Sequence, residues 1–438
     1  MKGDKKKFDY FNSILYCIEF IILFFIIFTY NMDKISIYNK EILLMLIIIM
    51  TMHLFLKSKI YLNKLHVLWI FSTIGLLISS LFSVDKKISL IYTIFYIIAI
   101  LIFIYLSNYN LNNNCNIYIP FIYISLLYTI CTFLPEYNIE VYEKLLNILF
   151  NSNSIEFSLN SITYFKRYTG IGRFFGFNAF VISIGIGVIL VLYFEKIFKF
   201  SKSLIMVIII VQLYAITKTG SRFALISSLI SILIILLMNR EIKNIKKINY
   251  ILLFLAVIVL SYAIITYYFN YNLVAIERFQ RNDGLGSINN RLILYKYAFN
   301  LFKEHPIYGV GINTFLSLTY IEPSMIENTY VHNVFLQLLC ETGIFGTLFI
   351  LPPYFATLIY TIKVIKKSEK NRLNYMSLYV QVIFLLYFIT GNPIYDYNIL
   401  LIYFVFISFL FMKNEEIKIS KDINYTNISY RSKGTTWI

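Results

Sequence analysis

Long apolar segments recur along the chain and are separated by shorter polar stretches. A helix needs about 20 mostly apolar residues to cross a bilayer. Twelve segments approach that length, at 11–30, 41–56, 65–83, 88–106, 117–134, 174–194, 204–217, 222–238, 250–269, 333–361, 375–390 and 398–412. The pattern predicts an all-α, polytopic transmembrane helix bundle that forms a single integral membrane domain over residues 1–438. The first run is expected to be an uncleaved span, because it is longer than the apolar core of a signal peptide.

Two polar stretches, 135–173 and 270–332, are much longer than the other connections. Long loops in compact proteins usually carry function. Within the second one, apolar residues recur at helical spacing from Ser287 to Phe302, at Ile288, Leu292, Tyr295, Phe299 and Phe302. This spacing predicts an amphipathic helix against the membrane or the bundle. Ser287 or Asn289 is expected to cap it, and Pro306 to stop the chain from continuing it.

Composition supports a membrane protein. Hydrophobic residues make up 59% of the chain, charged residues 14%, and the mean hydropathy is +0.70. Soluble domains are about 45–50% apolar and about 25% charged. These values exclude a soluble enzyme, a disordered protein and a repeat array. The four cysteines contain no C-x-x-C pair, so no metal or disulfide framework is predicted.

The basic residues predict the orientation. The net charge is +16; in a membrane protein, such an excess usually reflects cytoplasmic loops rather than nucleic-acid binding. With the N-terminus inside, the inner segments carry 24 of the 39 basic residues and the outer ones 15. Both termini, including a tail at 413–438, are therefore predicted to be cytoplasmic. The two long loops, 135–173 and 270–332, then lie on the outer face.

Three arginines fall near that outer face. Arg222 lies in Thr-Gly-Ser-Arg, Arg173 lies in Gly-Ile-Gly-Arg-Phe, and Arg291 lies on the predicted loop helix. Arginine forms planar, bidentate bonds to phosphate and keeps its charge. The three residues together suggest an anionic ligand. For each of them, the alternative is snorkelling or an ion pair with Glu277, Asp283 or Glu327.

Several residues around the last part of the long loop also have chemical potential. His332 stands where the loop enters the next span, and histidine exchanges protons near neutral pH. Glu341 lies inside that span, where an acid is a functional candidate by default; a hydrogen bond that fixes the helix is the preferred interpretation. Gly309 and Gly311 predict a tight turn. The chain has no Walker A loop, which argues against a nucleotide-driven pump.

These motifs resemble a known family. Pro-Ile-Tyr-Gly-Val-Gly-Ile-Asn-Thr-Phe (306–315), followed by His-Asn-Val-Phe-Leu-Gln-Leu-Leu-Cys-Glu-Thr-Gly-Ile-Phe-Gly (332–346), is similar to the signature of the O-antigen ligase and O-antigen polymerase superfamily. Thr-Gly-Ser-Arg (219–222) and Asn-Asn-Arg (289–291) are further matching pieces. The resemblance is specific over 219–346 and only architectural elsewhere.

The resemblance implies a membrane-embedded C-type glycosyltransferase in the bacterial cytoplasmic membrane. Such enzymes move a glycan from undecaprenyl diphosphate to an acceptor on the outer side, with inversion at the anomeric carbon and without a metal or other cofactor. His332 matches the histidine implicated in catalysis. Arg222 and Arg291 match arginines expected to hold the diphosphate, and Arg173 is a weaker candidate for the same ligand. The matched support residues are Gly309, Gly311, Asn333 and Glu341.

The acceptor stays open at this stage. A polysaccharide polymerase is preferred, because the abundance of Ile, Tyr, Phe, Asn and Lys indicates an AT-rich genome, which is compatible with cells that lack lipid A. An O-antigen ligase or a protein O-oligosaccharyltransferase is the alternative. A lipid-linked glycan flippase or transporter is the alternative from a different class, although the apolar spans show little sign of a polar path. The expected partners are the lipid-linked oligosaccharide, the glycan acceptor, the bilayer and a chain-length regulator, with no nucleic acid.

Overall fold

The computed structural model describes most of the predicted spans and part of each long loop. The described residues are 18–29, 31–35, 39–56, 60–108, 110–111, 117–195, 201–239, 283–321, 330–367 and 372–414. The predicted span at 250–269 and the predicted tail beyond residue 414 lie outside them.

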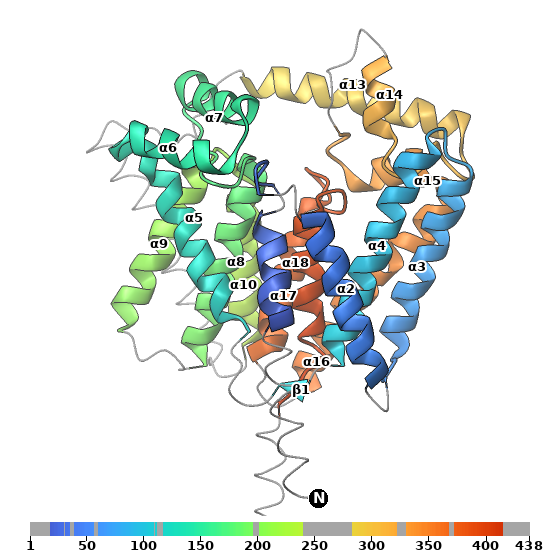
Figure 1. The fold of residues 1–438 in the computed structure, drawn as a ribbon, viewed down its shortest axis with the longest axis horizontal. Helices are drawn as coiled ribbons and strands as arrows, with labels where there is room; N and C mark the ends of the chain where they lie inside the picture. Colours follow the sequence, from blue (N-terminus) through green and yellow to red (C-terminus); the bar gives the residue numbers. More distant parts are fainter. Residues whose placement is uncertain are drawn as a thin grey trace, which may run out of the picture.

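The described chain is helical, as the hydropathy pattern predicts, and most helices stand side by side along one direction (Figure 1). A parallel pairing of two short segments, β1 (Asn110–Leu111) and β2 (Lys413–Asn414), is the extended structure within the described residues. An apolar helix covers Ile18–Thr29. The other upright helices are α2 (Asn39–Leu56), α3 (Lys64–Leu81), α4 (Lys86–Ser107), α5 (Ile119–Tyr137), α8 (Phe175–Phe194), α9 (Lys202–Lys218), α10 (Arg222–Met238), α15 (Val334–Ile350), α16 (Pro352–Lys367), α17 (Arg372–Tyr387) and α18 (Tyr397–Ser408).

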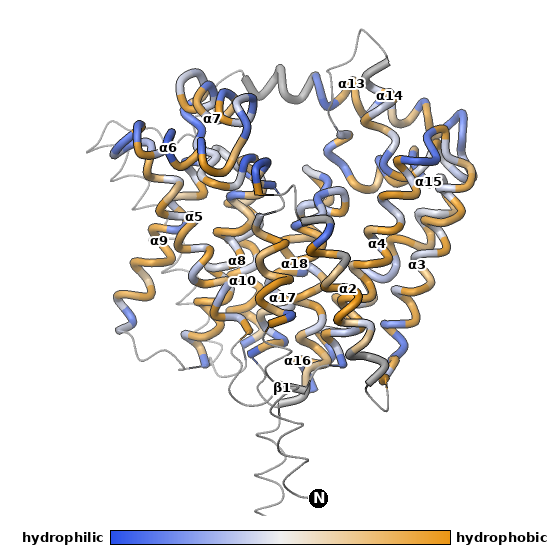
Figure 2. Tube along the Cα trace, viewed as in Figure 1, coloured by the Kyte–Doolittle hydropathy of each residue, from blue (hydrophilic) through white to orange (hydrophobic). Residues whose placement is uncertain are grey.

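Within the described residues, five helices are long and apolar enough to cross a membrane: α3, α4, α5, α8 and the joined pair α15–α16. Shorter apolar helices include Ile18–Thr29, α10 and α18. The upright helices are apolar through their middle parts, and polar residues gather at their ends (Figure 2). A multi-pass membrane protein is therefore confirmed. The count of twelve spans and the cytoplasmic termini stay predictions.

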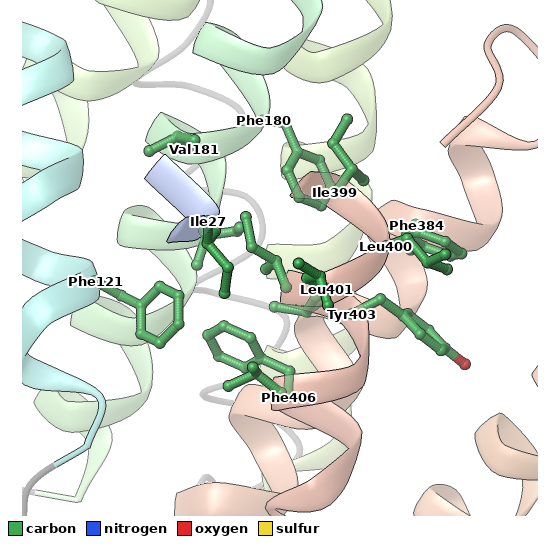
Figure 3. Packing of buried hydrophobic residues seen from close by; sticks show 14 of the residues in the cluster. Ile27, Phe121, Phe180, Val181, Phe384, Ile399, Leu400, Leu401, Tyr403 and Phe406 are labelled. Atoms are coloured by element: carbon green, nitrogen blue, oxygen red, sulfur yellow. The ribbon is translucent and has the colours of Figure 1, made fainter. Parts of the chain in front are cut away.

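The core lies where α5, α8, α17 and α18 meet (Figure 3). Helix α8 is apolar on all sides, and every residue from Phe177 to Leu192 is buried. A helix with this pattern belongs in the interior of a bundle. Phe121, Phe384 and Phe406 pack around it together with residues of α18. The core holds the outer ends of these helices in fixed positions.

Four further helices lie at the end of the bundle that is predicted to face outward. The first predicted outer loop, 135–173, contains α6 (Ile139–Leu149) and α7 (Ser152–Phe165). The second contains α13 (Asp283–Glu304) and the short α14 (Phe315–Ile321). Helix α13 lies across the ends of the upright helices (Figure 1). The outer loops are thus largely structured and cover one end of the bundle.

The loop helix is confirmed, but the predicted residues at its N-cap are wrong. Helix α13 begins at Asp283, so Ser287 and Asn289 lie inside it and neither caps its start. Its buried face consists of Leu294, Ala298 and Leu301, whereas Leu292 and Phe299 are exposed. The buried residues pack with Val310, Phe315, Val331 and Cys340. Helix α13 therefore docks through the face that carries the small Ala298. This face lies about 100° around the helix axis from the predicted apolar stripe at Ile288, Leu292, Tyr295, Phe299 and Phe302.

Candidate functional site

The predicted span at 333–361 is interrupted inside its outer half. Gly343 adopts φ 65° and ψ −172°, which breaks the helical hydrogen bonds of α15. The N–H groups freed by the break are satisfied from the preceding loop: Ile344 donates to the carbonyl of Pro306 at 2.9 Å, and Phe345 donates to that of Ile307 at 3.2 Å. A broken helix is tolerated at membrane depth only when its backbone groups find such partners.

The carbonyls freed on the other side of the break are also satisfied. Val310 N donates to the Cys340 carbonyl at 3.0 Å, and Gly311 N donates to the Glu341 carbonyl at 2.8 Å. The turn that contains Gly309 and Gly311 therefore packs into the break in α15 and pairs with its free backbone groups. Gly309 has φ +69°, and a Cβ on it would lie 2.3 Å from the carbonyl carbon of Glu341. Only glycine fits a left-handed backbone at such close approach.

Gly309→Ala should disrupt this junction. A left-handed conformation costs a non-glycine residue about 1–3 kcal/mol, and the new methyl group would collide with the Glu341 backbone. We expect a clear loss of monodisperse protein in detergent and a lower melting temperature. Thr163→Ala, on the exposed side of α7, is the control and should change neither. Normal folding of Gly309→Ala would contradict the close packing described above.

Two serines tie the same turn to the neighbouring spans. Ser79 on α3 donates to the Glu341 carbonyl at 3.0 Å and accepts from Ile312 N at 3.0 Å. Ser89 on α4 donates to the Ile312 carbonyl at 2.8 Å. These buried bonds fix the turn against both helices, and thereby fix the position of the chain that leads to α14.

Glu341 is fully buried and anchors the turn from the other side. Its carboxylate accepts from Asn313 N at 2.7 Å, from Phe315 N at 3.0 Å and from Gln337 Nε2 at 3.2 Å. Charge-assisted bonds of this kind stabilise a buried acid. The preferred interpretation, a hydrogen bond that fixes the helix, agrees with this geometry.

His332 lies at the outer mouth of α15, outside the membrane-spanning segment. Its backbone is left-handed, with φ 59°, and Asn333 follows as the N-cap of α15, accepting from Leu336 N at 3.1 Å. Burial lowers the pKa of His332 to about 4, and the positive charge of Arg291 adds to this effect. The imidazole is therefore neutral at pH 7, and Arg291 lies within electrostatic range of it.

Arg291 also interacts electrostatically with Tyr387, which lies at the end of α17. The charges of both Arg291 and Asp396 act on the Tyr387 phenol. The Tyr387 ring stacks on Phe223, with centroids 5.1 Å apart and an interplanar angle of 13°. Phe223 is the neighbour of Arg222 at the start of α10. These interactions connect Arg291 in the middle of α13 with His332, just before α15, and with Tyr387 at the end of α17, which stacks on the residue after Arg222.

The turn before α10 is positioned by an arginine that sequence reasoning overlooked. Gly220 has φ +68°, and Arg167 Nε donates to the Thr219 carbonyl at 3.1 Å. The Arg167 guanidinium also stacks over the Phe175 ring at 3.6 Å from its centroid. Arg222 then begins α10 as a partly exposed side chain. The Thr-Gly-Ser-Arg motif is therefore a rigid turn that presents Arg222 at the outer end.

Arg173 is held differently from the other two predicted arginines. Its Nη1 forms an ion pair with Asp33 Oδ1 at 2.8 Å, and Ser154 donates to the same carboxylate at 2.5 Å. The ion pair links the segment before α8 to α7 and to the 31–35 turn. This is the structural alternative considered for each arginine; a role in diphosphate binding stays a prediction for Arg173.

Asp396 was not among the residues predicted for the site. It precedes α18, and its Oδ1 accepts from Asn398 N at 3.0 Å and from Ile399 N at 3.1 Å. Burial raises the pKa of Asp396 to about 6. An acid in a short outer loop just before an apolar run is a helix-cap signal, and that signal could have drawn attention to it.

Comparison with known proteins supports the family resemblance. Residues 205–351 match the model of a family described as O-Antigen ligase. No curated protein matches the chain significantly. The matched range contains the Thr-Gly-Ser-Arg turn, α13, the G-x-G turn and the His-Asn mouth of α15. The match supports a relation of this region to the O-antigen ligase and polymerase superfamily of membrane proteins that process glycans.

Proposed function

We propose that this protein transfers a glycan from undecaprenyl diphosphate to a glycan hydroxyl at the outer face of the cytoplasmic membrane, as a polysaccharide polymerase. The observation that carries the proposal is the placement of a neutral, partly exposed His332 within electrostatic range of Arg291. A neutral imidazole can accept a proton, and a neighbouring guanidinium can bind phosphate oxygens. The electrostatic interaction between the two residues supports a role for both in this transfer.

The reaction can be written with these groups. The acceptor hydroxyl oxygen forms a bond to the anomeric carbon, and the bond from that carbon to the diphosphate oxygen breaks. The hydroxyl proton passes to the neutral imidazole of His332. Arg291 and Arg222 neutralise the negative charge that grows on the leaving undecaprenyl diphosphate, an interaction that is stronger in the transition state than in the bound donor. Attack from the side opposite the leaving group inverts the anomeric configuration.

The positive charge of Arg291 has a second effect in this scheme. It opposes protonation of His332 before the acceptor arrives. The same charge would therefore bind the donor and keep the base in its proton-accepting form.

A second candidate differs only in the acceptor. The matched family is described as O-Antigen ligase, which favours transfer to lipid A core or, as a variant, to a Ser or Thr of a protein. The donor, the membrane face and the roles of Arg222, Arg291 and His332 are the same in both proposals.

The decisive experiment supplies the reconstituted protein with an undecaprenyl diphosphate-linked repeat unit as the only glycan. A ladder of growing chains on a gel is the result expected for a polymerase. Transfer that occurs only after lipid A core or a Ser/Thr peptide is added would assign the second candidate. No transfer to any acceptor would overturn both and favour a flippase or transporter.

The pH dependence of transfer should report the lowered pKa of His332. Because the neutral form predominates above about pH 4, kcat/KM should stay nearly constant from pH 8 to pH 5 and fall only below that. A profile of kcat/KM against pH measures this. Arg291→Gln is the comparison; removal of the positive charge should move the acid limb to higher pH. An acid limb at the ordinary histidine pKa in the unmodified protein would contradict the proposed environment.

A further inference from the structure

The backbone just before His332 is held by one buried side chain on α15. Gln337 is fully buried. Its Oε1 accepts from Val331 N at 3.3 Å, and its Nε2 donates to Glu341 Oε1 at 3.2 Å. Gln337 therefore joins the residue before His332 to the carboxylate that anchors the G-x-G turn.

A second amide completes the connection from the neighbouring loop. Asn392 lies between α17 and α18, and its side-chain amide is 3.1 Å from His332 N and 3.1 Å from Gln337 Oε1. With its oxygen toward His332, the amide accepts from the His332 N–H and donates to Gln337 and to the Gly391 carbonyl. The hydrogen-bond network sets this orientation of the amide. Gln337 and Asn392 thus form a two-amide bridge between α15 and the α17–α18 loop.

The bridge acts at a strained position. His332 has φ 59°, a conformation that persists in non-glycine residues only where the surroundings enforce it. The bridge fixes the N–H groups of Val331 and His332, and a bond from Val334 N to the Phe388 carbonyl at 2.9 Å fixes the chain just beyond. The direction in which the imidazole leaves the backbone depends on all of these bonds.

We propose that Gln337 and Asn392 are positioning residues for the imidazole of His332. They touch neither donor nor acceptor; they hold the left-handed backbone that directs His332 toward the substrates. The consequence for turnover rests on the proposed function, whereas the effect on the backbone does not. Misplacement of a reacting group by about 1 Å can lower a rate by about a hundredfold, so loss of the bridge should reduce kcat rather than donor binding.

The test uses full-length protein in detergent or liposomes, with Gln337→Met, Asn392→Ala and the double variant. Methionine keeps the length of glutamine and loses both hydrogen-bonding groups. The matched control is Gln212→Met on α9, because Gln212 is equally buried and donates to Ser125 Oγ at 3.0 Å, outside the site. Three quantities are measured: backbone amide exchange of a peptide covering 330–334, the rate at which diethyl pyrocarbonate modifies His332, and kcat and KM for transfer.

The expected result is faster amide exchange at 330–334 and a changed modification rate in both single variants, with neither in the control. kcat should fall by about tenfold or more, while KM for the donor stays within about twofold. The kcat of the double variant should equal that of the less active single variant, because both substitutions break the same bridge.

Two results would overturn the proposal. Unchanged amide exchange and unchanged His332 modification would show that the bridge does not hold this backbone. Faster exchange with kcat values equal to that of the control would show that the held backbone does not position a reacting group. If the unmodified protein transfers no glycan at all, the proposed function fails, and the exchange and modification rates still decide whether the bridge positions His332.

Discussion

His332→Ala should lower glycan transfer by about 10²–10⁴-fold, the range typical for loss of a general acid or base. The structure gives two reasons to expect a large effect: burial lowers the pKa of His332 to about 4, so that the imidazole is neutral at pH 7, and the charge of Arg291 acts on it. Transfer is measured as the rate of chain growth in liposomes. His305→Ala is the matched control, because His305 is exposed at the end of the neighbouring helix and should tolerate the change.

His332→Gln separates proton transfer from orientation of the acceptor. Glutamine can form hydrogen bonds to a hydroxyl but does not take up a proton near neutral pH. A proton-accepting role predicts that His332→Gln is as slow as His332→Ala. Substantial activity in His332→Gln would favour the orienting role instead. Full turnover of His332→Ala would remove His332 from the reaction altogether.

The fold could be predicted largely because hydrophobicity acts locally. Every span predicted within the described residues falls on a helix, since the bilayer requires a long apolar run wherever the chain crosses. The loop helix was found for the same reason. Its buried face was not, because Leu294, Ala298 and Leu301 are selected by the surface they dock on, and a helical periodicity alone does not reveal that surface.

The site could be predicted only in part, for a related reason. The individual residues His332, Arg291 and Arg222 carry recognisable chemistry, and their motifs point to one family. The connections between them are not local. In the sequence, nothing distinguishes Gly343 from other glycines in apolar runs. In the structure, the helix breaks at Gly343, and the 306–311 segment packs into that break.

The amide bridge at the site is equally non-local. Gln337 and Asn392 are 55 positions apart in the sequence and meet only because α15 and the α17–α18 loop pack together. Arg167 was overlooked in the same way, because no motif distinguishes it and its role arises from its bond to the Thr219 carbonyl. Asp396 carries a helix-cap signal, but its electrostatic interaction with Tyr387 is not visible in the sequence. Sequence reasoning therefore identifies the reactive groups better than the residues that position them.

Arg291→Ala and Arg222→Ala should each reduce kcat/KM by about 10²–10³-fold, which corresponds to about 2.7–4 kcal/mol of lost transition-state stabilisation. In the unmodified protein, the two guanidinium groups neutralise the negative charge that develops on the diphosphate. Lysine should restore part of the activity, because it supplies the charge without the planar, bidentate geometry. The measurement is the initial rate of transfer at several donor concentrations. Lys303→Ala, a basic residue exposed on the same helix α13 as Arg291, controls for a general loss of positive charge.

Arg173→Ala distinguishes a specific site from a diffuse basic surface. The Arg173 guanidinium is paired with Asp33, so its removal should lower stability more than donor affinity, with kcat/KM falling far less than in the Arg291 variant. Partial rescue by Asp33→Asn would support this, since the second change removes the carboxylate left without its partner. Equal losses in the Arg173, Arg222 and Arg291 variants would instead place all three on the diphosphate. An unchanged rate in both Arg222→Ala and Arg291→Ala would contradict the proposal that these arginines bind the diphosphate. Loss of their positive charge should slow the departure of the diphosphate if they neutralise it.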